Sequence, residues 1–316
     1  MTRIVLAYSG ALADSVAIPW LAERYGAEVI AVTMDLGQGK EVLEEIRDRA
    51  LATGALRAHV VDARDLYLRD AVLRGLRAGM LWHRGASMAS ALAVPVIAEK
   101  LVEVARIEQA RAVAHGDAAG ADAAIDSVLR AIDPSLDVKA PAAEWAMTPP
   151  QQVEYARQRH VLLPAAMSGG VAIRGPAACP DEPALVDVTF ERGTPVATNR
   201  VLMPLGDLVA SLDILTTAHG VAAAAFGVLH LAHASLQRSA LSAHAYAFGD
   251  EVAEQYVRVL QEGSWFTPLR RALDAYVDVI QQRVSGTVRL KLLKAECTVV
   301  SADLAPLQPV ALTIAK

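Results

Sequence analysis

The first half of the sequence predicts an α/β fold with a doubly wound parallel sheet, and the second half predicts an α+β domain. In the first half, short apolar runs typical of strands alternate with helical stretches long enough to connect parallel strands. After about residue 165 this alternation stops, and a Gly/Pro/Ala-rich connector leads into a hairpin and several helices. We therefore expect two domains, residues 1–165 and residues 166–316.

The first domain is predicted to contain five strands, each followed by a helix or a turn. The strands are expected at 3–9, 28–35, 57–63, 110–117 and 137–142. The helices are expected at 14–26, 41–53, 66–80, 92–109 and 121–132. Ligands of such sheets bind at the carboxyl ends of the strands, where small or polar residues stand at Ser9-Gly10, Met34-Asp35 and His115-Gly116.

The second domain is predicted to begin with a β-hairpin at 184–199 that turns at Arg192-Gly193-Thr194. Four helices follow, near 205–219, 229–247, 249–262 and 267–284. A final stretch with partly alternating apolar residues, 287–302, is typical of a second hairpin.

Composition excludes several classes of protein. Of the 316 residues 53% are hydrophobic and 21% charged, so a substantial core is expected. The net charge of -5 and the lack of a basic patch argue against nucleic-acid binding, and no apolar run is long enough to span a membrane. Two widely spaced cysteines, Cys179 and Cys297, fit a reduced cytoplasm and show no metal-ligand spacing.

The turn after the first strand is the main candidate for chemistry. Residues 6–15 read LAYSGALADS, which offers backbone N–H groups, two hydroxyls and the positive end of a helix to an anion. Asp14 or Ser15 could equally be a simple helix N-cap. Neither common nucleotide fingerprint, G-x-x-x-x-G-K-[ST] or G-x-G-x-x-G, is present.

Several segments together resemble the argininosuccinate synthase family. The turn is similar to that family's pyrophosphate loop, SGG-L-D-T-S. VIAVTMDLGQG at 29–39, AVAHGD at 112–117 and above all GSWFTPLRRALDAYVDVIQQRVSGTVRLKLLK at 263–294 also resemble family segments. The resemblance implies an adenine nucleotide alpha hydrolase-like (PP-loop) domain followed by a synthetase domain with a C-terminal helix and arm.

The family's reaction adenylates citrulline with ATP and then joins it to aspartate. The resemblance implies ATP and Mg²⁺ as cofactors, with nucleotide contacts at Ala7, Tyr8, Ser9, Gly10, Ser15, Met34 and Gly116. It also implies assembly through the C-terminal helix, as a homo-oligomer (tetramer or dimer) or with a related synthase.

The loop departs from the family pattern at three positions. Ala11 stands in place of a glycine, which matters if that residue needs a positive φ angle or a close approach to phosphate. Ala13 stands in place of the family's aspartate, and Asp14 follows one residue late, which makes it a weak catalytic candidate. Met34 replaces a small alanine near adenine and is expected to narrow that pocket.

The amino-acid site departs further. The family's T-S-L-A-R-P is here SALAVP at 90–95, so Ser90 keeps one hydroxyl while Val94 replaces an arginine. The run that grips aspartate and citrulline has shrunk to residues 116–125, which leaves Asp117 and Asp122 as weak substrate-binding candidates. Charged amino-acid groups need charged partners, so citrulline and aspartate are not expected to bind in the usual way.

Two functions of different class remain open, and authentic argininosuccinate synthesis ranks behind both. One is a repurposed AMP-forming C–N ligase acting on an unidentified small-molecule or carrier-bound acceptor. The other is a non-catalytic paralogue that acts as a structural or regulatory subunit.

His230 and His233 share a helix face, but a third metal ligand is missing, so a packing role is favoured.

Overall fold

The computed structural model describes residues 2–116, 122–162, 179–222 and 224–306. The chain divides into two compact units. One comprises Met1–Ala71, Ser90–Gly170 and Val257–Arg270, and the other comprises Val72–Ala89, Val171–Tyr256 and Arg271–Lys316. The chain passes from the first unit to the second after residue 170, close to the expected boundary after residue 165. Two short segments do not follow this division: Val72–Ala89 belongs to the second unit and Val257–Arg270 to the first.

Packing explains these two exchanges. In the second unit, α4 (Leu73–Arg77) and the short strand β4 (Trp82–His83) pack on α10 (Ala224–Ala240). In the first unit, Gly263 lies so close to α6 (Asp122–Ile132) that a Cβ there would stand 2.6 Å from the Ala124 carbonyl oxygen. Neither unit is therefore a single continuous segment of the sequence.

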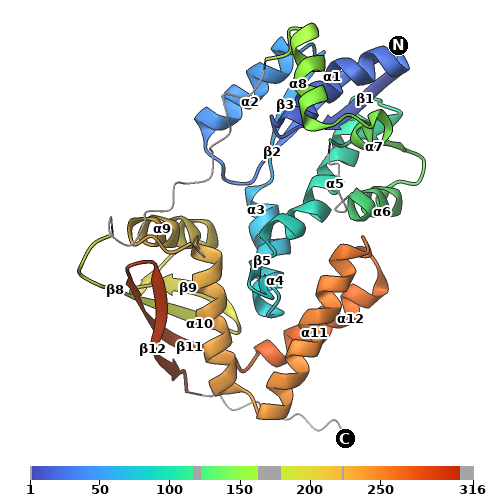
Figure 1. The fold of residues 1–316 in the computed structure, drawn as a ribbon. Helices are drawn as coiled ribbons and strands as arrows, with labels where there is room; N and C mark the ends of the chain where they lie inside the picture. The colour runs from blue at the N-terminus through green and yellow to red at the C-terminus, as the bar shows by residue number, and fades with distance from the viewer. Residues whose placement is uncertain (1, 117–121, 163–178, 223, 307–316) are drawn as a thin grey trace, which may run out of the picture. The chain divides into compact units, whose positions relative to one another are not determined.

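The first unit contains the predicted doubly wound sheet (Figure 1). Its five strands are arranged in the order β3-β2-β1-β6-β7, and every neighbouring pair is parallel. The strands are β1 (Thr2–Ala7), β2 (Ala27–Asp35), β3 (Arg57–Asp62), β6 (Ala112–Ala114) and β7 (Asp137–Lys139). Three of them lie within the predicted segments, and β1 and β2 each begin one residue earlier than predicted, which confirms the fold class.

Both faces of this sheet are buried, as a parallel sheet requires. On one face Ile4 and Leu6 belong to a core shared with α1 (Leu12–Tyr25) and α2 (Lys40–Ala52). On the other face Val5 and its neighbours pack with α5 (Ala89–Ile107) and α6. Alternate residues of one strand thus serve opposite cores, because side chains alternate across a strand.

Two parts of the first half differ from expectation. The helix predicted at 66–80 is broken into α3 (Arg64–Leu66), a π-helical turn (Tyr67–Val72) and α4. The last strand ends at Lys139, because Pro141 begins a helix, α7 (Pro141–Trp145), a position that suits proline. A further helix, α8 (Pro149–Gln158), follows a Thr148–Gln151 capping box that the sequence analysis did not identify.

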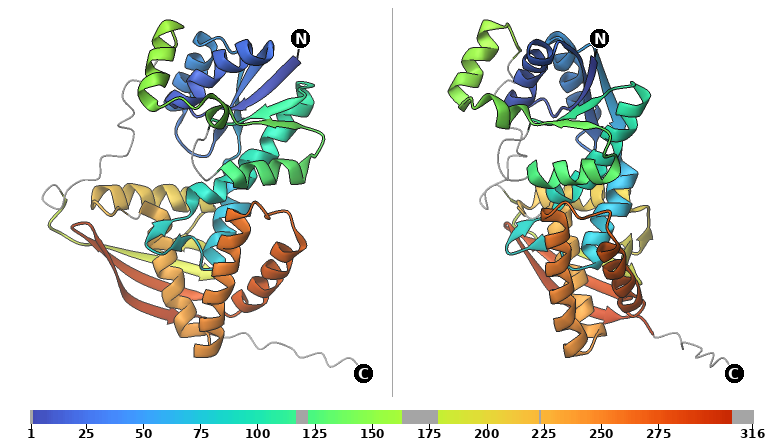
Figure 2. Two further views of the ribbon diagram at one scale, coloured as in Figure 1. Left: turned by 45° about the vertical axis from the view of Figure 1, so that its right-hand side comes forward. Right: turned by 90° about the vertical axis from the view of Figure 1, so that its right-hand side faces the viewer.

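The second unit contains an antiparallel sheet in the order β10-β9-β8-β11-β12. Its strands are β8 (Ala184–Glu191), β9 (Thr194–Thr198), β10 (Val201–Leu202), β11 (Gly286–Leu293) and β12 (Glu296–Leu304). Both predicted hairpins are confirmed, and the second is the long red pair of strands in Figure 2. Arg192 and Gly193 turn the first hairpin with φ angles of 50° and 76°.

Helices α9 (Leu205–Ala218) and α10 pack against this second sheet. The helix predicted at 229–247 ends at Ala240 instead, and α11 (Ala243–Gln261) begins three residues later. Ser242 explains the break, because its hydroxyl accepts a hydrogen bond from the Ala245 N–H at 3.3 Å and caps the new helix. Helix α12 (Pro268–Gln281) matches its prediction, and no helix in the described part of the chain is long and apolar enough to cross a membrane.

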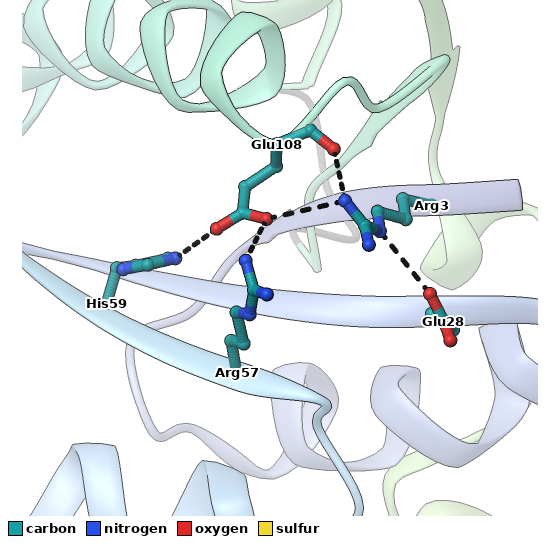
Figure 3. Close-up of polar contacts among 5 residues, drawn as sticks. All are labelled: Arg3, Glu28, Arg57, His59 and Glu108. Atoms are coloured by element: carbon teal, nitrogen blue, oxygen red, sulfur yellow. Dashed lines mark hydrogen bonds and ion pairs between the residues drawn. The ribbon is translucent and has the colours of Figure 1, made fainter.

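A charged cluster lies at the amino end of the first sheet (Figure 3). We call Arg3, Glu28, Arg57, His59 and Glu108 the amino-end cluster. The Glu108 side chain is 3% exposed, and its two oxygens lie 2.7 Å from Arg57 Nη1 and 2.7 Å from His59 Nε2. Arg3 Nη1 donates to the Glu108 carbonyl oxygen at 2.9 Å.

Glu108 is ionised within this cluster. Burial by itself raises the pKa of the Glu108 carboxyl, but the hydrogen bonds from Arg57 and His59 outweigh burial and hold the pKa below its ordinary value. The charged carboxylate therefore ties the end of α5 to β1 and β3.

Candidate functional site

The candidate site lies at the carboxyl end of the first sheet, where β1 and β6 are neighbours. From β1 the chain continues to β2 on one side, whereas from β6 it continues to β7 on the other. Such a reversal opens a crevice between the two strand ends, and ligands of open α/β sheets bind there. Ser9 and Gly10 follow β1, and Gly116 follows β6, so the fold brings these three predicted residues together.

The loop after β1 has the backbone shape of an anion site. Gly10 has a φ of +80°, which favours glycine, and a Cβ there would also stand 3.0 Å from Ile46 Cγ1 and press on that side chain. Ala11 has φ -65° and ψ 163°, an extended conformation that alanine adopts without strain. Position 11 therefore does not need the positive φ angle that would have favoured a glycine.

Helix α1 begins at Leu12 directly after this loop. Its N-cap is Ala11, which makes no side-chain capping hydrogen bond, and the Ala11 N–H itself donates to Ser9 Oγ at 3.3 Å. The alternative that Asp14 or Ser15 is the N-cap is therefore wrong, because both residues lie inside the helix. An uncapped helix start presents N–H groups that lack partners within the helix, together with the positive end of the helix dipole.

Asp14 points back into the loop from the first turn of α1. Its side chain is buried, at 8% exposure, and Oδ2 accepts hydrogen bonds from the Ser9 N–H at 2.8 Å and from the Ser9 hydroxyl at 2.5 Å. Its Oδ1 stands 1.9 Å from the place where a Cβ at position 116 would lie. The carboxylate thus occupies the space between the loop and Gly116.

Arg49 of α2 supports the same loop. Its Nη1 donates to the Gly10 carbonyl oxygen at 2.9 Å, and Thr33 Oγ1 donates to the Tyr8 carbonyl oxygen at 2.9 Å. These bonds hold the loop backbone through two of its carbonyl oxygens. The sequence analysis missed Arg49, and no local pattern could have identified it, because its contact depends on how α2 packs.

Tyr8 and Ser15 form a buried pair beneath the loop. The Tyr8 hydroxyl lies 3.0 Å from Ser15 Oγ, and Tyr8 belongs to the core that faces α1 and α2. Burial raises the pKa of Tyr8 despite the opposing hydrogen bond from Ser15 and the nearby charge of Arg49. The Ser15 hydroxyl, which was expected to meet a phosphate, therefore faces the core here.

Ala7 and Met34 pack together in the core on the α5 side of the sheet. Met34 is buried, and its carbonyl oxygen accepts a hydrogen bond from Gln38 Nε2 at 2.9 Å. Beyond it, a pocket opens at the carboxyl ends of β2 and β3, lined by Asp35, Gly37, Gly39, Lys40, Leu43, Glu44, Arg47, Val60 and Arg64. This pocket adjoins the second strand end that the sequence analysis selected.

Charge in this pocket is largely paired. Arg64 lies 2.6 Å from Asp62 and 3.4 Å from Asp35. The hydrogen bonds from Arg64 lower the pKa of Asp62 to about 2. The arginine is therefore held by two strand-end carboxylates.

The remaining candidates are less closely connected to the loop. Ser90 is exposed near the start of α5, Asp122 is the first residue of α6, and Asp117 lies outside the described residues. His115 is buried at the end of β6, with Nε2 2.8 Å from Asp126 Oδ1. Among the described residues, no group of three or more His, Cys, Asp or Glu side chains could hold a metal ion.

Comparisons with known proteins agree over most of the chain. The family described as "Arginosuccinate synthase N-terminal HUP domain" matches residues 3–162, and "Arginosuccinate synthase C-terminal domain" matches residues 222–305.

Curated relatives are similar over nearly the whole length. An argininosuccinate synthase of Pelotomaculum thermopropionicum is 34% identical over 94% of this chain and 87% of its own length. Those of Oceanobacillus iheyensis and Carboxydothermus hydrogenoformans are 30% and 33% identical, covering 95% and 92% of this chain and 84% and 85% of their own.

Proposed function

The chain belongs to the argininosuccinate synthase family of ATP-dependent ligases. From this premise we propose that it is an AMP-forming ligase that does not use citrulline and aspartate in the usual way. The observation that carries the proposal is the loop at the β1–β6 crevice. Gly10 reverses the backbone there, and the uncapped start of α1 supplies N–H groups for the pyrophosphate of ATP.

The chain's own residues bind and orient in this proposal. An oxygen of the acceptor would attack the α-phosphorus of ATP and release pyrophosphate. An amine would then attack the carbon that carries this oxygen and lose a proton, so that a C–N bond forms and AMP leaves with the oxygen. The N–H groups at the start of α1 stabilise the negative charge of the departing pyrophosphate. Gly116 keeps the facing strand end free of a side chain, and Arg49 holds the loop backbone in place. Mg²⁺ would enter with the phosphates, as it commonly does.

The changed acceptor is supported by the residues that replace the family's amino-acid contacts. Val94 and the neighbouring Ala91 offer no charge or hydroxyl to a carboxylate. Four lost hydrogen bonds to charged groups, at about 1.5–3 kcal/mol each, would remove most of the binding free energy of a micromolar substrate, about 8 kcal/mol. The curated relatives carry the name argininosuccinate synthase, so citrulline with aspartate must be the first substrate pair assayed.

The test begins with calorimetric titration of the purified chain with Mg-ATP, with Ser9→Ala as the loop control. Micromolar binding that weakens in Ser9→Ala supports the proposal. A pyrophosphate-release assay then compares citrulline plus aspartate with a panel of less polar acceptors and amines. Release with citrulline and aspartate at ordinary enzymatic rates would overturn the changed acceptor and leave an authentic synthase.

A second candidate is a non-catalytic paralogue, and one observation favours it. The Asp14 carboxylate takes two donors of the loop, Ser9 N–H and Ser9 Oγ–H, that a phosphate would need. No ATP binding up to millimolar concentration would favour this candidate.

We further propose that the chain is cytoplasmic and forms a homo-oligomer, or a hetero-oligomer with a related synthase, through α12. This helix exposes Leu269 and Val279. Sedimentation analysis of the purified chain, alone and mixed with such a synthase, tests the assembly.

A further inference from the structure

We infer that Asp14 is a built-in occupant of the phosphate loop, a carboxylate that the pyrophosphate part of a nucleotide has to displace. This inference rests on the proposed function, since it concerns how the same loop is kept closed to phosphate. It assigns Asp14 a regulatory role in place of the catalytic role expected from its proximity to the family's missing aspartate.

The first support is the identity of the donors that Asp14 uses. Both of its hydrogen bonds to Ser9, at 2.8 Å and 2.5 Å, come from neutral groups at the end of β1. A backbone N–H and a hydroxyl carry one hydrogen each, so neither can serve a phosphate oxygen fully while it serves Asp14. The carboxylate therefore takes the hydrogen bonds that an anionic ligand would otherwise receive.

The second support is the position of the carboxylate across the crevice. Asp14 Oδ1 lies 1.9 Å from the site of a Cβ at residue 116, and its Cγ lies 3.0 Å from that site. The group consequently fills the gap between the ends of β1 and β6. A phosphate entering this gap would meet both the bulk and the negative charge of the side chain, and like charges at such distances repel strongly.

The third support is that the occupant can leave. Asp14 is the third residue of α1, and Ser9 is exposed, so water can satisfy the Ser9 donors once the carboxylate rotates away. The loop backbone does not depend on Asp14 alone, because Arg49 and Thr33 hold it through the Gly10 and Tyr8 carbonyl oxygens. Release of the side chain should therefore leave the loop folded.

The experiment measures binding of inorganic pyrophosphate without metal, and then of Mg-ATP, to the full chain by calorimetry. Asp14→Ala removes the carboxylate, and Asp14→Asn keeps its shape without its charge. Asp48→Asn is the control, because it removes a negative charge from the exposed surface of α2, where Asp48 pairs with Arg47. Circular dichroism confirms that each variant is folded.

We expect Asp14→Ala to bind pyrophosphate about tenfold or more tightly than the parent chain, since one hydrogen bond to a charged group changes a binding constant by about that factor. The pyrophosphate affinity of Asp14→Asn should lie between those of the parent chain and Asp14→Ala, and the affinity of Asp48→Asn should equal that of the parent chain. Equal or weaker pyrophosphate binding by folded Asp14→Ala and Asp14→Asn would overturn the inference.

The two proposals fail in different ways. If the parent chain and both Asp14 variants bind Mg-ATP equally, the inference fails and the proposed nucleotide binding stands. If only the variants bind, the inference is supported and the parent chain is closed to ATP. If no variant binds either probe, both the inference and the proposed ligase function are overturned.

Discussion

The two ends of the first sheet each contain a buried carboxylate, and the two are satisfied in opposite ways. At the amino end, Glu108 accepts hydrogen bonds from the Arg57 guanidinium, which is charged, and from the His59 imidazole. At the carboxyl end, Asp14 accepts hydrogen bonds from the neutral N–H and hydroxyl of Ser9.

This difference separates a structural carboxylate from one that occupies a ligand's place. Glu108, at the end of α5, binds residues of β1 and β3, and its negative charge compensates the positive charges of Arg3 and Arg57. Asp14 bridges the first turn of α1 to Ser9 in the loop before it, and the two Ser9 donors are of the kind that helices and loops commonly offer to phosphate. Burial alone therefore does not indicate function, whereas the kind of donor does.

The largest effect is expected from Glu108→Ala, which should lower the free energy of unfolding by about 2–3 kcal/mol. Removing one partner of a buried ion pair leaves the others uncompensated, although the partial exposure of Arg57 and His59 reduces the cost. Urea denaturation monitored by circular dichroism measures the change.

Glu44→Gln provides the matched control for Glu108→Ala. Glu44 pairs with Lys40 on the surface of α2, where both side chains are largely exposed. Removing the Glu44 charge should change the free energy of unfolding by no more than about 0.5 kcal/mol. Equal effects of the two variants would contradict the structural role of Glu108.

Gly116→Ala should have the next largest effect, about 1.5 kcal/mol, because the new Cβ would push the Asp14 carboxylate away from Ser9 and would lie 3.2 Å from the Asp14 backbone nitrogen. In an Asp14→Ala background the same substitution should cost about 1 kcal/mol less, since the overlapping group is gone. A double-mutant cycle of urea unfolding measures this coupling. Strictly additive costs would show that Asp14 does not stand against residue 116.

Asp14→Ala alone should lower the free energy of unfolding by about 1 kcal/mol or less. The lost terms include the two bonds to Ser9 and the interaction of a negative charge with the start of α1. Exposure of Ser9 lets water replace the carboxylate, so the loss should be smaller than that for Glu108→Ala. A loss as large as that of Glu108→Ala would remove the contrast between the two ends.

Most of the fold could be predicted from the sequence because strand and helix periods are local properties. All five parallel strands and the Gly26 end of the first helix follow from such patterns. The π-helical turn at 67–72 could not be predicted, since nothing in its sequence distinguishes it from a regular helix. The early end of α10 was missed because Ser242 was not identified as a cap.

The candidate site was predictable only in outline. Strand ends and glycines placed Ser9, Gly10 and Gly116 at one crevice, but the directions of side chains depend on packing. Ser15 and Asp14 illustrate this, since one faces the core with Tyr8 and the other faces the loop. Arg49 reaches the loop from a helix 39 residues away in sequence, which no short motif records.

The smallest effect on stability is expected from lowering the pH. It tests whether Glu108, at the amino end of the sheet, acts through its charge. The folded pKa of Glu108 lies below the ordinary glutamate value of 4.5, because the hydrogen bonds from Arg57 and His59 outweigh burial. The contribution of Glu108 to stability is therefore complete above that ordinary value and is lost as pH falls through the folded pKa. The difference in unfolding free energy between the parent chain and Glu108→Gln should be constant near neutral pH and shrink below about pH 4.5. Urea titrations from pH 7 to pH 3 measure it. A difference that grows with acid would mean that the Glu108 pKa is raised, and that its neighbours act as packing partners and not as counter-charges.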